Sequence, residues 1–442
     1  MLFETDKQTL DDLNIFGKPG SDSIYTLFNN THTRGGAGIL EQMFLYPLAG
    51  AAAINARSET IRFFAAGNMP FPLSSALFDS IELYLENDDE RTRLSPEKET
   101  MAGKLQQLIA TDHQYKLISN GIAAIAEVLQ QLRSFINSIS PAVTATAFAP
   151  VVQEMNELLA DAGLEPLLQL KVKSKLSYAQ TARFDDLLRF NKASVLRRLL
   201  FHLYHLDVYI AVAGIARKHD FVFPEATGND QASLYLEEVY HPQVANAVPN
   251  TLHMTPGNNV VFLTGANMAG KSTFMKSLGI ALYLAHMGFP VPARKMTFSV
   301  RNGIFTTINL ADDLSMGNSH FYAEVLRLKK VAQEMVLSKN LFIIFDELFR
   351  GTNVKDAYEA TIAITEAFAT RRNCMFVVST HIVEAGEVLK ERCKGILFNY
   401  MPTTMRNNVP VYTYRLAPGI TADRHGMVII NNEGILDIIN NG

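Results

Sequence analysis

One stretch in the second half of the chain restricts the fold more than any other. Residues 260–265 are the apolar run Val-Val-Phe-Leu-Thr-Gly, and the pattern Gly265-x-x-x-x-Gly270-Lys271-Ser272 leads into an apolar, helix-like segment. Glycines at these places let the backbone wrap so that its N–H groups point inward at a phosphate. Lys271 can reach phosphate oxygens, the Ser272 hydroxyl can ligate Mg²⁺, and the N-terminus of the following helix adds a favourable dipole.

The order of strand, glycine loop and helix predicts a site for ATP with Mg²⁺. A glycine-rich turn with a purely structural role is the alternative, but the flanking strand and helix favour the nucleotide. The residues expected to surround the phosphates belong to the loop and the first helical turn: Gly265, Ala266, Asn267, Met268, Ala269, Gly270, Lys271, Ser272 and Thr273.

Composition sets wider limits. The 442 residues allow two or three domains, and 48% apolar with 19% charged residues is ordinary for a globular protein. Forty basic against 44 acidic residues leave a net charge of −4, so any contact with nucleic acid requires a local patch.

The cysteines and the N-terminus indicate a compartment. Cys374 and Cys393 are the only cysteines and have no histidine at metal-ligand spacing, which predicts reduced thiols. The first residues lack a basic and apolar leader, and the chain has no run of 18 uncharged apolar residues. We therefore expect a cytoplasmic protein that does not span a membrane.

Residues 1–89 combine short apolar runs with turn signals. We expect a short strand or extended segment at 9–16 and a helix from Ile24. Residues 33–38 contain three glycines and predict an interruption, after which helical spacing resumes at 39–47. Residues 51–64 have the spacing of a further helix, so this part predicts a small helical domain.

Residues 90–224 are mostly long helices. Apolar residues recur at three- and four-residue spacing from 105 to 136, Pro141 and Pro150 are expected to break the run, and another helix begins near Tyr178. Such long helices favour an extended antiparallel arm, with an ordinary helical bundle as the alternative. Basic residues outnumber acidic ones from 171 to 218, which either a solvated helix face or contact with DNA phosphates explains.

Short β-like runs alternate with helices in residues 225–442. The strands expected are 233–236, 260–264, 341–345, 375–379, 395–400 and 411–416, and the helices expected are 272–287, 321–338, 356–370 and 383–392. This alternation predicts an α/β domain with a largely parallel sheet and helices on both faces.

Two acids follow the apolar run 341–345. Ligands of a parallel sheet bind at the carboxyl ends of its strands, so Asp346 is expected to lie near the phosphate loop. There Asp346 would hold Mg²⁺ together with Ser272, and Glu347 would polarise the water that attacks the γ-phosphate. An acidic strand end without catalytic role is the alternative.

A third strand end and two loops complete the candidate site. His381 follows the run 375–379 and predicts contact with the γ-phosphate or a nearby water, although a histidine after a strand is often structural. Residues 350–353 form a polar loop that either contacts a partner subunit or is a solvated turn. Ser319 either caps the helix from Phe321 or faces the nucleotide of another subunit.

These motifs, in this order, resemble those of the MutS proteins of DNA mismatch repair, a family of ABC-type ATPases. Residues 264–273 are similar to the family's Thr-Gly-Pro-Asn-Met-Gly-Gly-Lys-Ser-Thr, with Ala266 and Ala269 in place of Pro and Gly. Residues 291–293, 304–306 and 311–314 resemble the approach to its signature loop, which Ser319, Phe321 and Glu324 match. Residues 346–352 resemble Asp-Glu-Ile-Gly-Arg-Gly-Thr, and residues 379–381 match the Thr-His motif that follows.

The N-terminal half resembles the family more loosely. Thr33, Gly36, Ile39, Leu40, Leu45 and Pro47 fall at places of its core segment, with Gly38 where an arginine is expected. The resemblance implies a short form that lacks the mismatch-reading and connector domains, with only residues 134–175 available for a clamp. Val248 stands where an aromatic residue that stacks on adenine is expected.

The resemblance implies three domains: a helical core at 1–89, a lever region with a reduced or absent clamp at 90–224, and an ABC-type P-loop ATPase domain at 225–442. It also implies a homodimer in which Ser319 of one subunit completes the nucleotide site of the other, and in which ATP hydrolysis moves the levers on duplex, mismatched or branched DNA. An ATP-switched protein-interaction module without mismatch recognition is the alternative. An ABC transporter subunit fits less well, because the long helices and the Arg-Gly-Thr after the acids match MutS better.

Overall fold

The chain divides into two compact units, each assembled from separate stretches of sequence. The computed structural model describes residues 3–18, 20–87, 89–94, 110–171, 176–228, 232–308, 320–337, 339–349, 351–406, 409–421 and 438–439. Unit 1 comprises Met1–Leu27, Phe44–Ser58 and Ile215–Gly442, and unit 2 comprises Phe28–Met43 and Glu59–Gly214. The three domains predicted from sequence stay a prediction.

Unit 1 is built around a six-stranded sheet in the order β12-β9-β4-β8-β7-β6. Every neighbouring pair is parallel except β12 with β9. Strands β4, β6, β7 and β8 are buried along their whole length, which their runs of Val, Ile and Phe permit. The strands are β4 (Val260–Gly265), β6 (Gly303–Thr307), β7 (Leu341–Phe345), β8 (Met375–Ser379), β9 (Ile396–Met401) and β12 (Ala417–Pro418).

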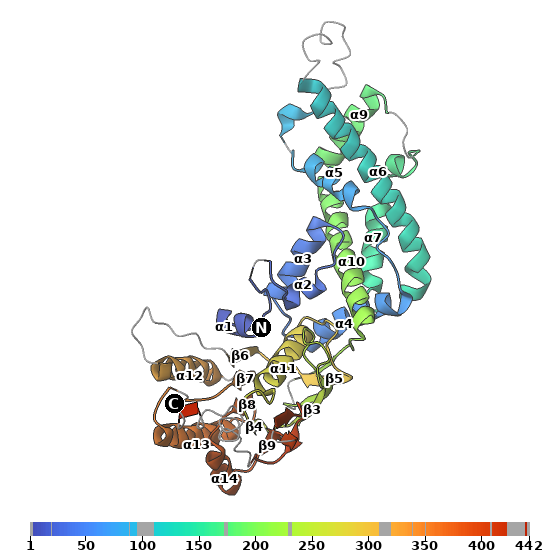
Figure 1. The fold of residues 1–442 in the computed structure, drawn as a ribbon. Coiled ribbons are helices and arrows are strands. Elements are labelled where there is room, and N and C mark those ends of the chain that lie inside the picture. Colours follow the sequence, from blue (N-terminus) through green and yellow to red (C-terminus); the bar gives the residue numbers. More distant parts are fainter. Residues whose placement is uncertain are drawn as a thin grey trace. The chain divides into compact units, whose positions relative to one another are not determined.

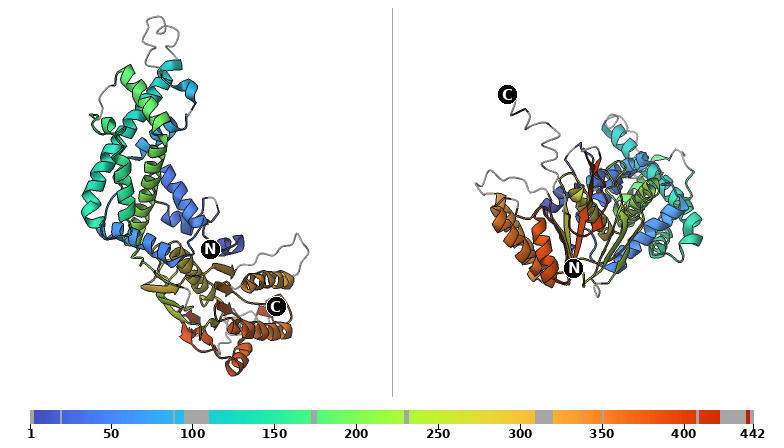
Figure 2. Two further views of the ribbon diagram at one scale, coloured as in Figure 1. Left: turned by 180° about the vertical axis from the view of Figure 1, so that it is seen from behind. Right: turned by 60° about the horizontal axis from the view of Figure 1, so that its bottom comes forward.

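Helices cover both faces of this sheet (Figures 1 and 2). On one face α12 (His320–Val336), α13 (Val354–Thr370) and α14 (Val383–Arg392) share a buried apolar cluster with alternate residues of the central strands. On the other face α11 (Lys271–His286), almost wholly buried, packs against β4 and β6. The predicted parallel sheet with helices on both faces is therefore present.

A second sheet and a hairpin complete the β structure that is described. The four-stranded sheet has the order β1-β5-β2-β3 and consists of β1 (Glu225–Thr227), β2 (Leu234–Val239), β3 (Asn250–Met254) and β5 (Lys295–Ser299). The hairpin joins β10 (Thr403–Arg406) to β11 (Val409–Tyr412). Strands β1, β3, β5, β6, β10 and β12 were not predicted. The strand predicted at 411–416 ends at Tyr412, because Tyr414 leaves the extended region at φ 56°.

The N-terminal residues contain two corrections to the sequence prediction. Residues 9–16, predicted as extended, begin inside helix α1 (Lys7–Asp12), because the Asp6 side chain caps that helix by accepting from the Thr9 N–H. Residues 33–38, predicted as an interruption, run into helix α3 (Arg34–Leu45). Helices α2 (Ile24–Phe28) and α4 (Ala51–Gly67) agree with the predicted pattern.

Unit 2 is helical throughout the residues that are described. Helix α6 (Ala110–Val143) packs against α5 (Ser75–Leu85), α7 (Ala149–Leu159), α8 (Glu165–Leu168) and α9 (Tyr178–Asp185). The π-helical turn η2 (Asp186–Asn191) joins α9 to α10 (Ala193–His219), and η1 (Glu90–Thr92) is a short 3₁₀ turn. The long helices α6 and α10 extend along the unit with the shorter helices packed on them (Figure 1).

Two details of these helices differ from expectation. Pro141 does not end α6 but lies in its last turn. Helix α10 is the one helix of the described residues that is long and apolar enough to cross a bilayer, yet 72% of its most apolar window is buried in the protein. The core helix of a folded domain has this character.

Candidate functional site

The glycine loop lies between the central strand β4 and helix α11. Gly265 (φ 147°) and Gly270 (φ 101°) turn the chain through positive φ, and Gly270 is the N-cap residue of α11. Lys271 is buried at the first turn of that helix, and its Nζ donates to the carbonyl oxygens of Gly265 (2.9 Å) and Ala266 (3.2 Å). The lysine is thus held inside the curve of the loop.

Burial disfavours the charged form of the Lys271 ammonium group. Desolvation lowers the pKa of its ammonium group below the ordinary value, while the carboxylates of Asp346 and Glu347 oppose that shift. A further anion beside the ammonium group would favour its charged form.

Four side-chain oxygens, from Ser272, Ser379 and Asp346, meet near the ends of β4, β8 and β7. Ser272 Oγ, in the first turn of α11, donates to Asp346 Oδ2 at 2.5 Å. Ser379 Oγ, the last residue of β8, donates to the other carboxylate oxygen of Asp346 and accepts the Glu347 N–H at 3.3 Å. These strands are parallel neighbours, which places their carboxyl ends at one edge of the sheet.

Glu347 and His381 form a pair beside these oxygens. The Nε2 atom of His381 lies 2.7 Å from Glu347 Oε1, and both side chains are partly exposed. Glu347 has a left-handed backbone (φ 53°), a conformation that a residue with a side chain adopts at some cost. A strained acid at the end of a strand, oriented by a histidine, is an arrangement often met at catalytic sites.

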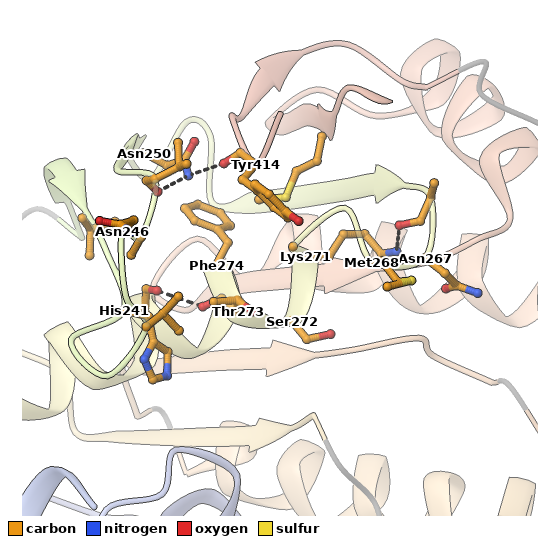
Figure 3. Close-up of a pocket in the computed structure, with 18 of the residues that line it drawn as sticks. His241, Asn246, Asn250, Asn267, Met268, Lys271, Ser272, Thr273, Phe274 and Tyr414 are labelled. Atoms are coloured by element: carbon orange, nitrogen blue, oxygen red, sulfur yellow. Dashed lines mark hydrogen bonds between the residues drawn. The ribbon is translucent and has the colours of Figure 1, made fainter. Parts of the chain in front are cut away.

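A cavity of about 480 Å³ is lined by residues of the glycine loop, with Lys271, Ser272 and Glu347 among its walls. In Figure 3, His241, Asn246 and Asn250 lie at one end, Asn267 and Met268 at the other, and Phe274 and Tyr414 between them. The cavity has the size and mixed lining of a small-molecule site.

Tyr414 is the exposed aromatic side chain of this cavity. A Cβ added to Gly270 would lie 3.0 Å from the Tyr414 ring, so the ring lies against the glycine loop. The buried amide of Asn250 holds this segment from two sides, because its Nδ2 donates to the Tyr414 carbonyl (2.9 Å) and its Oδ1 accepts the Leu416 N–H (2.6 Å). Val248 lines the cavity as well, without an aromatic ring.

The remaining predicted residues lie at or near this cavity where they are described. Ala266, Asn267, Met268 and Thr273 line it, and Met268 is 78% exposed. Ala269 is buried under the loop. Ser319 and Arg350 lie outside the described residues.

Sequence reasoning missed three residues of this site. Ser379 was used only as part of a motif, although it joins Asp346 to Glu347. Tyr414 lies within the strand predicted at 411–416, Asn250 begins the unpredicted strand β3, and no local pattern relates the two. The one usable signal was the serine that directly ends the apolar run of β8.

Fold and site together define an α/β protein whose candidate ligand site lies at the carboxyl edge of a parallel sheet, joined in one chain to a helical unit. Two family models match the sequence, MutS domain III over residues 8–213 and MutS domain V over residues 261–441. The chain belongs to the MutS family.

Several curated relatives agree with this assignment, and each is a DNA mismatch repair protein MutS. The protein of Pseudothermotoga lettingae is 27% identical over 272 residues, which are 60% of this chain and 33% of the relative. That of Nitratidesulfovibrio vulgaris is 31% identical over 265 residues, 57% of this chain and 29% of the relative. That of Rickettsia felis is 36% identical over 228 residues, 50% of this chain and 24% of the relative. The match spans a third or less of each relative.

Proposed function

We propose that this chain is an ATPase that uses ATP and Mg²⁺ at the edge of the six-stranded sheet and acts on DNA. The observation that carries the proposal is the meeting of Lys271 and Ser272, at the start of α11, with Asp346, Glu347 and His381 at two neighbouring strand ends. Phosphoryl transfer needs mainly positioning and stabilisation of charge, which a cation, a metal-binding acid and a water-orienting acid provide.

Magnesium fits the pair of Ser272 and Asp346. Their side-chain oxygens lie 2.5 Å apart, and neighbouring ligands of an octahedral Mg²⁺ lie about 2.9 Å apart, so a small adjustment opens room for the ion. Protein sites for Mg²⁺ often supply one or two side chains and leave the other positions to phosphate and water. Bound there, the ion would neutralise negative charge on the phosphates.

The other residues have separate tasks in this proposal. Lys271 would exchange its loop carbonyls for phosphate oxygens. Glu347 would accept a hydrogen bond from the attacking water, and His381 would hold that carboxylate in place from 2.7 Å. Tyr414, against the loop at Gly270, would offer its ring to the base.

The wider activity follows from the relatives, which are named for DNA mismatch repair. We propose a cytoplasmic homodimer on duplex, mismatched or branched DNA, with each nucleotide site completed by Ser319 of the partner subunit. Unit boundaries fall within α2, α3, α4 and α10. Of these helices, α4 and α10 are the longest and are the proposed path by which turnover in unit 1 moves unit 2.

The test is ATP turnover by the purified chain across a panel of duplex, mismatched and junction DNA at low salt, where phosphate contacts are strongest. We expect at least one DNA structure to change the rate, and we expect Lys271→Ala to abolish turnover with every DNA. Absence of turnover in the folded wild-type chain would remove the ATPase proposal. Turnover that no DNA changes, with no gel shift, would remove the DNA proposal alone.

One observation favours a second candidate, an ATP-switched module that binds a protein rather than DNA. In the basic stretch, Arg189 pairs with Asp185, Lys192 with Asp161 and Arg198 with Glu154. These three cations are already neutralised, which weakens the case for phosphate contact there. A partner that co-purifies after nuclease treatment, and that ATP releases, would favour this candidate.

A further inference from the structure

Helix α1 covers the edge of the six-stranded sheet at the end of β6. Thr306 donates its N–H to Thr9 Oγ1 (2.9 Å) and its hydroxyl to Asp12 Oδ2 (2.7 Å), and the Ile308 N–H donates to the same Asp12 oxygen (2.9 Å). An edge strand presents a row of unpaired N–H groups. Here side chains from α1 take the place of a further strand.

Arg327 joins this edge to α12. Its guanidinium is buried, pairs with Asp6, and donates to the Thr306 carbonyl (2.7 Å) and to Thr307 Oγ1 (3.1 Å). Asp6 also accepts from Lys330 (2.9 Å), whose side chain is 53% exposed. Arg327 therefore holds the last two residues of β6, whereas Lys330, among the described residues, bonds to Asp6 and not to β6.

Thr307 is in turn bonded to the metal-binding acid of the proposed site. The Asp346 N–H donates to the Thr307 carbonyl at 2.9 Å, directly after the last β6–β7 pair, Thr307 with Phe345. Asp6, Arg327, Thr307 and Asp346 thus form one continuous line of polar contacts from α1 to the carboxyl end of β7.

The negative charge of Asp6 is fixed in the folded protein. Burial by itself raises the pKa of Asp6, but hydrogen bonds from Arg327 and Lys330 outweigh it and hold the pKa well below the usual range. Asp6 is therefore ionised at every pH at which the protein would be assayed, and Arg327 keeps its partner.

We propose that Arg327, oriented by Asp6, is a positioning residue that sets the place of Asp346 for Mg²⁺. The proposal rests on the nucleotide site proposed above. Residues that orient a metal ligand typically contribute 10- to 100-fold to metal affinity. A role limited to packing α1 against α12 would change stability and leave the response to metal as it is.

The experiment compares Arg327→Met and Asp6→Asn with Lys330→Met, a matched control that removes a cation from the same acid without touching β6. We expect the Mg²⁺ concentration for half-maximal ATP turnover to rise about tenfold or more in Arg327→Met and Asp6→Asn. It should stay within about twofold of wild type in Lys330→Met. Arg327→Lys keeps the positive charge but loses the planar guanidinium and its several donors, so its Mg²⁺ concentration for half-maximal turnover should lie between those of Lys330→Met and Arg327→Met.

A binding measurement separates this proposal from the activity. ADP affinity, followed by calorimetry without and with Mg²⁺, should be unchanged in Arg327→Met without the metal and should lose most of the gain that Mg²⁺ gives wild type. An unaltered Mg²⁺ response in a folded Arg327→Lys or Asp6→Asn variant would overturn the positioning role. Wild-type ADP binding that shows no gain from Mg²⁺ would instead count against the proposed metal site.

Discussion

Tyr414 takes a left-handed backbone (φ 56°) beside the glycine loop, where its ring borders the proposed nucleotide pocket. The sequence has Val248 where a base-stacking aromatic is expected, and both residues line the same cavity. Asn250 holds the Tyr414 and Leu416 backbone, which keeps this segment beside the glycine loop. Tyr414 therefore supplies this cavity with an aromatic ring, which Val248 lacks.

At the residue scale we predict that Tyr414→Ala weakens ADP binding by about 5- to 150-fold, the range for loss of one stacked base at about 1–3 kcal/mol. Tyr414→Phe should bind as wild type, because the ring is retained. Calorimetric titration with ADP measures the effect. Tripolyphosphate, which has no base, serves as the control and should bind both variants equally. Equal ADP affinity in Tyr414→Ala and wild type would show that the adenine base does not stack on Tyr414.

The N-terminus of α3 shows at the element scale why a glycine-rich segment can be helical. The fully buried carboxylate of Asp207, on α10, accepts the N–H groups of His32 (3.0 Å) and Thr33 (2.8 Å) and the Thr33 hydroxyl (2.8 Å). Thr33 Oγ1 in turn accepts the Gly36 N–H at 2.9 Å. A buried acid at the positive end of a helix is favourable, and Gly36 lets it approach.

At this scale two glycines of one helix are expected to respond with opposite signs. A Cβ at Gly36 would lie 2.8 Å from Thr33 Oγ1 and closer still to Asp207 Oδ2, so Gly36→Ala should destabilise the chain by about 2–3 kcal/mol. A Cβ at the exposed Gly38 meets nothing within 4 Å, so Gly38→Ala should stabilise by up to about 1 kcal/mol. Urea unfolding followed by helical circular dichroism measures both. Two shifts of the same sign would show that Asp207 does not govern this helix start.

At the scale of the whole molecule, one chain divides into two units whose stretches alternate along the sequence. Helices α4 and α10 each contribute residues to both units, so backbone hydrogen bonding is continuous from one unit into the other along each helix. The proposed dimer adds a second copy to this arrangement.

We predict that Glu347→Gln traps the proposed dimer in its ATP-bound state. The amide retains the contact distance to His381 but loses the negative charge that orients water, so ATP binds and is not hydrolysed. Light scattering after gel filtration should give twice the monomer mass with ATP and a smaller mass without it. Lys271→Ala should show the same mass with ATP as without it, because it does not bind the nucleotide. A Glu347→Gln protein that stays monomeric with saturating ATP would contradict the dimer.

Whether a feature of the fold or site could be predicted depends on how far apart in the sequence the residues that form it lie. The strands at 260–264, 341–345 and 375–379 and the helices after them were predicted because apolar runs and helical spacing are local. The meeting of Lys271, Asp346 and His381 was also predictable, because parallel strands bring their carboxyl ends to one edge. The helix start at Arg34 was not, because its capping acid lies 174 residues away from Thr33.

The sequence by itself determined the glycine loop, the central strands β4, β7 and β8, and the two acids that follow β7, since each is encoded in neighbouring residues. The tertiary structure alone decided that Tyr414 borders the loop, that Ser379 joins Asp346 to Glu347, and that Arg327 binds Asp6. Arg327 and Asp6 are 321 residues apart. Contacts of that kind follow from how whole elements pack to bury their apolar faces, and no local pattern records which polar groups the packing will bring together.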